Sequence, residues 1–323
     1  MELSGIVTPA FWAGFLLFVL AMLALDLFVL GGGRAHRVSV REALGWTLVW
    51  VALALTFNAL LWWWLDGTLG REIANQKALE FLTGYLIELS LSVDNVFVFI
   101  MIFSFFAVPP EYQRRVLVYG VLGAIVMRAT MILAGSVLVT KFHWILYLFG
   151  IFLVITGFKM LIFADKSADL EKNPVLHWMR GHLRITKEYH GERFWILRDG
   201  VRWFTPMFLV LILIETSDVI FAVDSIPAIF AITTDPFIVF TSNIFAIMGL
   251  RAMYFLLADM AGRFHLLKYG LALVLVFVGV KMLVAGFYKI PIGIALGVVA
   301  IILLSSVAAS LIATRPGKME SGQ

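Results

Sequence analysis

Residues 88–99 read ELSLSVDNVFVF and residues 215–230 read ETSDVIFAVDSIPAIF, and both stretches lie inside long apolar runs. Their polar residues are Glu88, Asp94 and Asn95 in the first, and Glu215, Asp218, Asp224 and Ser225 in the second. A carboxylate at membrane depth costs about 2.5–3.5 kcal/mol to insert, so such residues are functional candidates by default. Two similar clusters in one chain predict a duplicated unit with a shared site between the copies.

The composition of the chain around these stretches is typical of a membrane protein. Of the 323 residues, 62% are hydrophobic and 14% are charged, whereas a soluble protein carries about 25% charged residues. Cysteine is absent, which excludes disulfides, thiolate metal sites and cysteine nucleophiles. The net charge of +4 is concentrated in particular loops, so it indicates membrane orientation and no nucleic-acid partner. The first apolar run lacks a basic leader and more spans follow it, so we expect no cleavable signal peptide.

A helical span needs about 20 apolar residues, and by this rule we predict an all-α polytopic membrane protein with about nine transmembrane helices. The predicted spans lie near 8–30, 43–65, 79–107, 116–140, 143–163, 204–232, 237–258, 267–286 and 290–313. Lysine and arginine decide their orientation, because one alternate set of loops carries 17 of them and the other set carries four. The positive-inside rule therefore predicts that the N-terminus lies outside the cell and the C-terminus in the cytoplasm.

Three pairs of spans match in the same order and predict an inverted repeat. The third and sixth spans align through SVDNVFVF and AVDSIPAI, at an offset of 130 positions. The fourth and seventh match Arg128 with Arg251, and the fifth and eighth match Lys159 with Lys281. Because each unit has three spans, the second copy enters the membrane from the opposite side, which is typical of transporters.

The repeat divides the chain into five parts. We expect two N-terminal spans in 1–78, the first repeat in 79–163, a cytoplasmic loop in 164–203, the inverted second repeat in 204–286, and a last span with a cytoplasmic tail in 287–323. The 164–203 loop mixes both signs of charge with tryptophans, which favours an interfacial amphipathic segment and a solvated linker.

The buried charges define the chemistry that the site can perform. The predicted acids are Asp26, Glu88, Asp94, Glu215, Asp218 and Asp224, and the predicted bases are Arg128, Lys159, Arg251 and Lys281. If all were ionised, the core would carry about two negative charges, which one divalent cation or two protons would neutralise. The carboxylates, the Asn95 amide and the Ser225 hydroxyl are hard oxygen ligands, which suit Mg²⁺, Ca²⁺ or Mn²⁺. We expect no catalytic residue and no bound cofactor.

Helical spacing leaves the geometry of the site open. Residues six apart, such as Asp218 and Asp224, differ by about 240° in azimuth on a straight helix. Either the helices are interrupted near Asp94 and Asp224, or the acids line an extended polar crevice. Pro227 favours interruption in the sixth span, because it cannot donate to the carbonyl of Val223.

Several of these residues have a simpler alternative role. Arg128 and Arg251 are predicted to balance charge as buried counter-ions. Lys159 and Lys281 lie near span ends, where snorkelling to the interface is the commoner role. Asp26 is either an interfacial acid or part of the ion path, and Asn243 is either interhelical hydrogen-bonding glue or part of that path.

The motifs ELSLSVDNVFVF, RRVLVYGVLGAIVMRA, LRAMYFLL and ETSDVIFAVDSIPAIFAITTDPFIVFTSN resemble the TerC/Alx family of bacterial integral membrane proteins over nearly the whole chain. The family carries a historical tellurium-resistance label. The resemblance implies export of divalent metal, chiefly Mn²⁺, with kinship to inverted-repeat exporters of the LysE type. The acidic motif residues of the family carry over to Glu88, Asp94, Glu215, Asp218 and Asp224.

The leading functional hypothesis is therefore a Mn²⁺ exporter that works by alternating access and exchanges protons. The alternative is a metal-binding membrane sensor or scaffold of the tellurium-resistance type, without transport. An enzyme is not expected, because the sequence has no zincin HExxH motif and no nucleotide-binding loop. The expected partners are a metal ion and the lipid bilayer, and the sequence identifies no protein partner.

Overall fold

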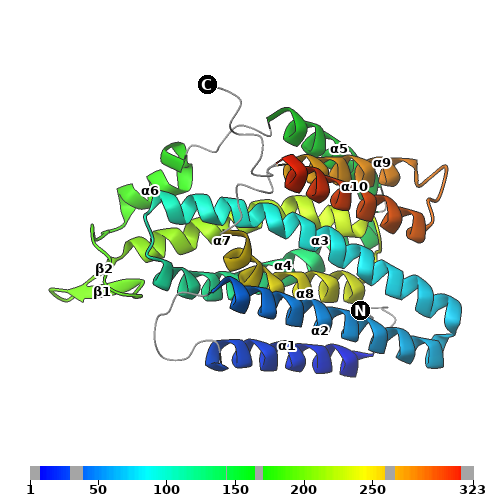
Figure 1. Ribbon diagram of the computed structural model, residues 1–323, viewed down its shortest axis with the longest axis horizontal. Coiled ribbons are helices and arrows are strands. Elements are labelled where there is room, and N and C mark those ends of the chain that lie inside the picture. The colour runs from blue at the N-terminus through cyan, green and yellow to red at the C-terminus, as the bar shows by residue number, and fades with distance from the viewer. Residues whose placement is uncertain (1–7, 30–38, 143, 164–169, 259–265, 314–323) are drawn as a thin grey trace.

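A computed structural model describes residues 8–29, 39–142, 144–163, 170–258 and 266–313, except for the side chains of residues 25–29 and of Asp94. Figure 1 shows the elements of this part of the chain. The helices are α1 (Pro9–Val29), α2 (Val40–Leu69), α3 (Arg71–Phe105), α4 (Pro110–Lys141), α5 (Ile145–Phe163), α6 (Pro174–His182), α7 (Pro206–Phe230), α8 (Pro236–Ala258), α9 (Leu267–Val284) and α10 (Ile292–Ala313). A short 3₁₀ helix (Leu170–Lys172) precedes α6, and the strands are β1 (Trp195–Arg198) and β2 (Val201–Phe204).

The predicted all-α polytopic fold is confirmed. Within the described residues, eight helices are long and apolar enough to cross a membrane, and each lies over a predicted span. The remaining predicted span corresponds to α1, which is apolar and has 21 residues. The largest shift is in α3, which begins at Arg71 instead of near position 79. Gly70 separates it from α2 with a φ of 92°, a conformation that glycine adopts without steric cost.

The helices begin where their sequences supply caps or prolines. Ser39 caps α2, since its hydroxyl accepts a hydrogen bond from the Glu42 N–H at 3.2 Å. Asp235 caps α8 in the same way through the Phe237 N–H at 3.0 Å. Proline occupies an initial position of α4, α6 and α7, where its missing N–H costs no helical hydrogen bond.

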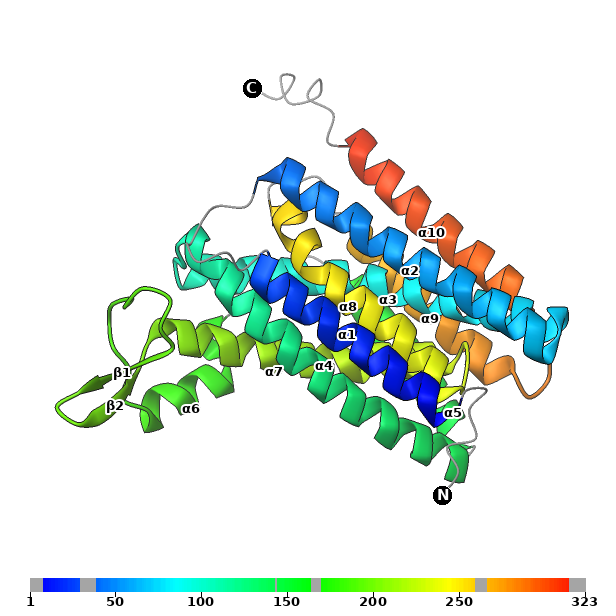
Figure 2. The same cartoon turned by 90° about the horizontal axis from the view of Figure 1, so that it is seen from below.

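The long helices run side by side from one end of the bundle to the other (Figures 1 and 2). Helix α8 is the most enclosed, because its whole apolar stretch is buried, and α2, α3 and α4 pack around it. Helices α2, α5 and α10 are the most exposed of the eight, which suits lipid-facing positions. We call the end that carries β1 and β2 the hairpin end, and the opposite end, with Gly70 and residues 231–235, the turn end.

Helices α5 and α9 approach each other through glycine. A Cβ atom built on Gly157 would lie 2.6 Å from Val276 Cγ2 and 2.8 Å from the Ala272 carbonyl oxygen. A Cβ atom built on Gly279 would lie 2.8 Å from Val154 Cγ2 and 2.7 Å from the Gly150 carbonyl oxygen. Any side chain at Gly157 or Gly279 would therefore push the two backbones apart, as at small-residue interfaces of membrane helices.

The segment after residue 169 is folded, so the prediction of a solvated linker is wrong. Helix α6 buries Leu176 and Met179, and β1 pairs with β2 through the two-residue turn Asp199–Gly200. Both turn residues have positive φ, 53° and 74°, as the turn favoured in such hairpins requires. The Tyr189 hydroxyl donates to the Phe106 carbonyl oxygen at 2.7 Å and so ties this segment to the end of α3.

The two acidic helices are continuous. Helix α3 runs through Asp94, and α7 runs through Asp224 and Pro227. Interruption, one of the two geometries that the sequence left open, is therefore not found, and the prediction that Pro227 interrupts the sixth span is wrong. Helix α7 continues past Pro227, and the Ala231 N–H donates to the Pro227 carbonyl oxygen at 3.1 Å.

Candidate functional site

The centre of the bundle holds a buried ion-pair triad of Glu88, Arg128 and Asp218. Arg128, on α4, is 1% exposed. Its Nη1 donates to the Glu88 carboxylate on α3, while its Nη2 donates to Asp218 Oδ1 on α7 at 3.1 Å. Nη1 also lies 3.2 Å from the Ser225 hydroxyl. One guanidinium thus joins three helices through charge-assisted hydrogen bonds, which are the stronger kind.

Oxygen atoms without hydrogen-bond partners lie on the same helices. Among the described residues, buried side-chain oxygens with no partner include Glu88 Oε2, Ser92 Oγ, Asn95 Oδ1 and Glu215 Oε2. A buried polar atom without a partner is costly and needs an explanation, such as a bound ion or water. These carboxylate, amide and hydroxyl oxygens are also the donor set that a hard divalent cation prefers.

Glu215 lies one helical turn before Asp218 and shares its electrostatic environment. Its carboxylate packs against Gly123 of α4, where a Cβ atom would overlap it. Glycine at position 123 therefore provides the space in which this acidic side chain lies between α4 and α7.

Asp224 lies apart from the triad. Its half-buried carboxylate is within hydrogen-bonding reach of the Thr156 hydroxyl and within electrostatic range of Lys159, both on α5. The side chain of Lys159 is exposed. Its positive charge is close enough to attract the Asp224 carboxylate. The structure therefore brings Glu88, Asp218 and Ser225 together around Arg128, and it places Asp224 at a second position.

The remaining predicted site residues have different surroundings. The side chains of Asp26 and Asp94 lie outside the described part of the structure. Asn243 on α8 is fully buried, and neither polar atom of its amide has a partner among the described residues. Arg251 on α8 is also buried.

Two small cavities meet at Arg251. One, of about 10 Å³, is lined by Asp218, Arg251 and apolar residues of α3, α4 and α7, and its volume is at the lower limit for a single water molecule. The other, of about 20 Å³, is lined by Glu42, Arg114, Arg251 and their neighbours towards the hairpin end. Arg251 thus separates the surroundings of Asp218 from the first turns of α2 and α4.

No preformed metal cage is present in the part of the chain that is described, where no group of three or more histidine, aspartate or glutamate side chains could hold a metal ion. The guanidinium of Arg128 occupies the space between Glu88 and Asp218 instead. A cation could bridge these two carboxylates only after Arg128 had moved away from at least one of them.

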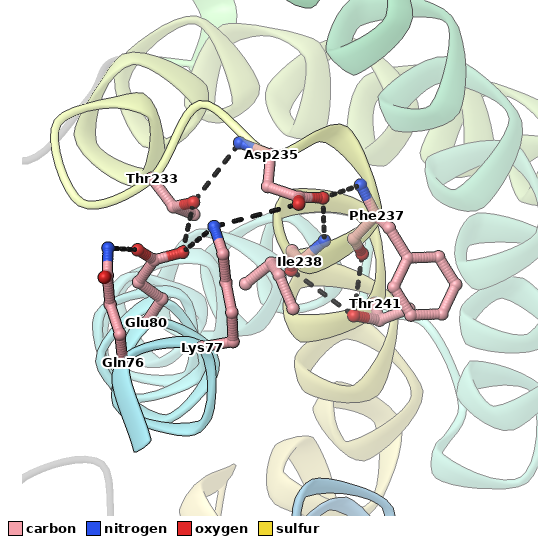
Figure 3. Close-up of polar contacts among 8 residues, drawn as sticks. All are labelled: Gln76, Lys77, Glu80, Thr233, Asp235, Phe237, Ile238 and Thr241. Carbon is pink, nitrogen blue, oxygen red and sulfur yellow. Dashed lines mark hydrogen bonds and ion pairs between the residues drawn. The ribbon is translucent and has the colours of Figure 1, made fainter. Parts of the chain in front are cut away.

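A polar network at the turn end was not predicted from the sequence. Figure 3 shows Gln76, Lys77 and Glu80 of α3 facing Thr233 and Asp235 of the α7–α8 turn. Glu80 is 4% exposed. From the sequence, an acid this close to the end of a predicted span is interpreted as an interfacial residue. Its burial follows only from the packing of α3 against the α7–α8 turn.

Lys281 also differs from its predicted role. Its side chain is buried, and its amine donates to the Ala231 carbonyl oxygen at 3.0 Å. It therefore lies inside the bundle, so the prediction that it snorkels is wrong for this residue.

The fold and site are those of a polytopic membrane protein with a buried ionic centre, and sequence comparison places it in a family. The profile of the "Integral membrane protein TerC family" matches residues 73–318. The chain belongs to the TerC family.

Relatives of nearly equal length agree with this placement. The chain is 59% identical over 292 residues to a Salmonella typhi protein named "Putative membrane-bound redox modulator Alx", covering 90% of this chain and 91% of the relative. It is 58% identical to the protein of the same name in Escherichia coli K12, covering 92% of each. A Myxococcus xanthus protein, "Uncharacterized membrane protein STKORF319", is 49% identical and covers 95% of this chain and 94% of its own length. No solved structure matches the chain.

Proposed function

We propose that this protein exports divalent metal cations, with Mn²⁺ as the main cargo, across the bacterial inner membrane by alternating access. The single observation that carries the proposal is the Glu88–Arg128–Asp218 triad. Its two carboxylates come from different halves of the chain and are fully buried with one base between them. Ionisable groups inside a membrane protein mark ion pathways by default, because burying them is costly.

The triad suits the metal-free state of such an exporter. Two carboxylates and one guanidinium leave one negative charge, and the carboxyl group of Glu215 lies one helical turn from Asp218. A divalent cation that displaced Arg128 from Glu88 or Asp218 would gain those oxygens and the unpartnered oxygens of Glu88, Asn95 and Glu215. Arg128 would then act as an internal cation that occupies the site when cargo is absent.

Reciprocal contacts support the inverted repeat on which alternating access would rest. The offset of 122 that matches Lys159 with Lys281 also matches Gly157 with Gly279. Gly157 contacts Ala272 and Val276, and Gly279 contacts Gly150 and Val154, which are the positions that the same offset interchanges. Glu88 and Asp218 are likewise matched, at the offset of 130. A pseudo-two-fold axis between α5 and α9 would account for both pairings.

The proposed direction of transport is from the hairpin end to the turn end. The hairpin end carries the basic loops, so the positive-inside rule assigns it to the cytoplasm. The small cavity beside Asp218 and the one near Glu42 lie in line towards that end and share Arg251. Cargo would therefore enter past Arg251 and reach the triad from the cytoplasm.

The redox role in the name of the relatives fits metal handling better than thiol chemistry. This chain contains no cysteine, so it cannot exchange thiols and disulfides through its own residues. An exporter of a redox-active metal would influence cellular redox balance indirectly, by setting how much of that metal the cell retains.

The deciding experiment is metal flux in proteoliposomes that contain the purified protein, with Mn²⁺, Ca²⁺, Mg²⁺ and Zn²⁺ compared. We expect Mn²⁺ flux in the wild type and no flux in Glu88→Gln or Asp218→Asn, which each remove one carboxylate of the triad. Asp199→Asn, on the exposed turn of the hairpin, is the matched control and should transport like the wild type. Flux of no divalent ion, or wild-type flux in Asp218→Asn, would overturn the proposal. Mn²⁺ binding without flux would favour a metal sensor or scaffold instead.

A further inference from the structure

A buried charge network closes the turn end of the bundle, and Glu80 lies at its centre. Glu80 Oε2 accepts hydrogen bonds from Lys77 Nζ at 2.8 Å and from the Thr233 hydroxyl at 2.6 Å. Its other oxygen accepts from Gln76 Nε2 at 2.8 Å. The Glu80 carboxylate is therefore fully engaged although it is buried, and Figure 3 shows these groups converging on it.

The same network holds the α7–α8 turn against α3. Lys77 Nζ lies 3.8 Å from Asp235 Oδ2, and the Asp235 N–H donates to the Thr233 hydroxyl at 3.2 Å. Asp235 also caps α8, so the network acts directly on the first turn of that helix. Lys281 of α9 lies within electrostatic range of Glu80 and binds the last turn of α7 through Ala231.

The network lies at the turn end, on one side of the triad along α3. Glu80 and Glu88 are eight residues apart on α3, which is about 12 Å along the helix axis. Between them, a Cβ atom on Gly84 would lie 3.0 Å from the Ser242 hydroxyl of α8. Helices α3 and α8 are therefore in close contact between the triad and the network, so this contact and the network together cover the triad on the side of the turn end.

We propose that this network is the gate at the turn end, with Lys77 as a tethered cation that opens it by leaving Glu80 and Asp235. The proposal rests on the proposed transport function and adds the element that blocks exit. The charges of Glu80, Asp235, Lys77 and Lys281 cancel, so the closed gate is neutral. The Lys77 side chain is already 17% exposed, so water can solvate it as it moves, whereas an apolar seal would gain nothing from solvation.

The absence of cysteine makes the gate directly testable, because a single introduced thiol is the only one in the chain. Ser242→Cys is a conservative reporter at a fully buried position below the gate. The full chain is placed in lipid nanodiscs without metal, and the labelling rate by a charged, water-soluble thiol reagent is measured. We expect slow labelling with the gate intact. Combining the reporter with Lys77→Gln should raise the rate about tenfold or more, because hydrogen bonds to charged groups are among the stronger ones.

Two controls and one substitute variant separate a gate from general loosening. Lys289→Gln removes the same charge from an exposed lysine near the turn end and should leave the labelling rate of Ser242→Cys unchanged. Ser136→Cys is a buried reporter on α4, outside the network, and should stay protected in Lys77→Gln. Thr233→Val replaces Lys77→Gln if that variant is not monodisperse, and it should also raise labelling. An unchanged rate at Ser242→Cys, or equal increases at both reporters, would overturn the gate. Because no metal is involved, this result is independent of whether the protein transports Mn²⁺.

Discussion

Glu88 and Asp218 lie 130 positions apart in the chain and bind the same guanidinium, that of Arg128. They are equivalent positions of the two acidic motifs, and each belongs to a different half of the chain. The contact makes Arg128 both the counter-ion of the site and the link between the halves. A cation could bind both carboxylates only after Arg128 had moved away from them.

Removal of Arg128 should be strongly destabilising. Arg128→Ala leaves two buried carboxylates without their base, and breaking a buried ion pair costs about 3–5 kcal/mol. The free energy of unfolding, measured by denaturation in detergent, should fall by about this amount. Combining it with Glu88→Gln and Asp218→Asn should recover part of the loss, because the unpaired charges are then gone. Arg202→Ala, at an exposed position of β2, is the control, and an equal effect of both arginine variants would refute a central role for the triad.

The α5–α9 interface should not tolerate side chains at its glycines. Gly157→Leu and Gly279→Leu each force atoms into contacts that are already shorter than 3 Å for a Cβ atom, and overpacking costs about 1–3 kcal/mol. Gly297→Leu on α10 enters open space and should be neutral. Thermal unfolding in detergent measures all three. If the first two variants lose stability to different extents, the two contacts are not equivalent and the pseudo-two-fold axis loses support.

The orientation of the protein in the membrane can be measured with fusion reporters. A reporter fused after Gln323 should give a cytoplasmic signal, and one fused after Asp235 should give a periplasmic signal, as the 17-to-4 distribution of basic residues predicts. The measurement is the activity of a paired alkaline phosphatase and fluorescent-protein fusion at each position. Signals on the opposite sides would invert the proposed direction of transport.

Mn²⁺ binding should compete with protons. Carboxylate ligands must be deprotonated to bind a metal, so the apparent affinity for Mn²⁺ should rise with pH. Under proton exchange, Mn²⁺ efflux should acidify the compartment that it leaves, and a protonophore should abolish accumulation against a gradient. A pH-sensitive dye inside proteoliposomes measures the coupled proton flux. Transport that is unchanged over about two pH units would instead indicate a uniporter.

Tyr189 should make the stability of the folded segment 170–204 fall at alkaline pH. Burial raises the pKa of Tyr189 from 10.0 to about 12, so the folded protein holds the phenol proton more tightly than the unfolded chain. The stability that this provides is complete below about pH 10 and is lost as pH rises towards 12. Tyr189→Phe should lower the unfolding free energy by about 1 kcal/mol at neutral pH and remove this alkaline dependence. Denaturation and protease cleavage within residues 170–204, measured against pH, test both effects.

The sequence by itself determined the class of fold and the family, and it identified the acidic residues that are candidates for the site. Each span was visible as a local apolar run, since burial in lipid requires a continuous stretch of apolar side chains. Glu88 and Asp218 were visible because a charge is conspicuous where every neighbour is apolar. The family could also be recognised from the acidic motifs and their flanking residues.

The tertiary structure decided which of these charges meet. Nothing local assigns Arg128 to Glu88 and Asp218 while Asp224 lies with Thr156 and Lys159, because that choice depends on how α3, α4, α5 and α7 pack. The burial of Glu80 could not be predicted for the same reason, since its partner Thr233 lies 153 residues away in the chain. Hydropathy is a property of neighbouring residues in the chain, whereas an ion pair between helices is fixed only when packing brings distant residues within hydrogen-bonding distance.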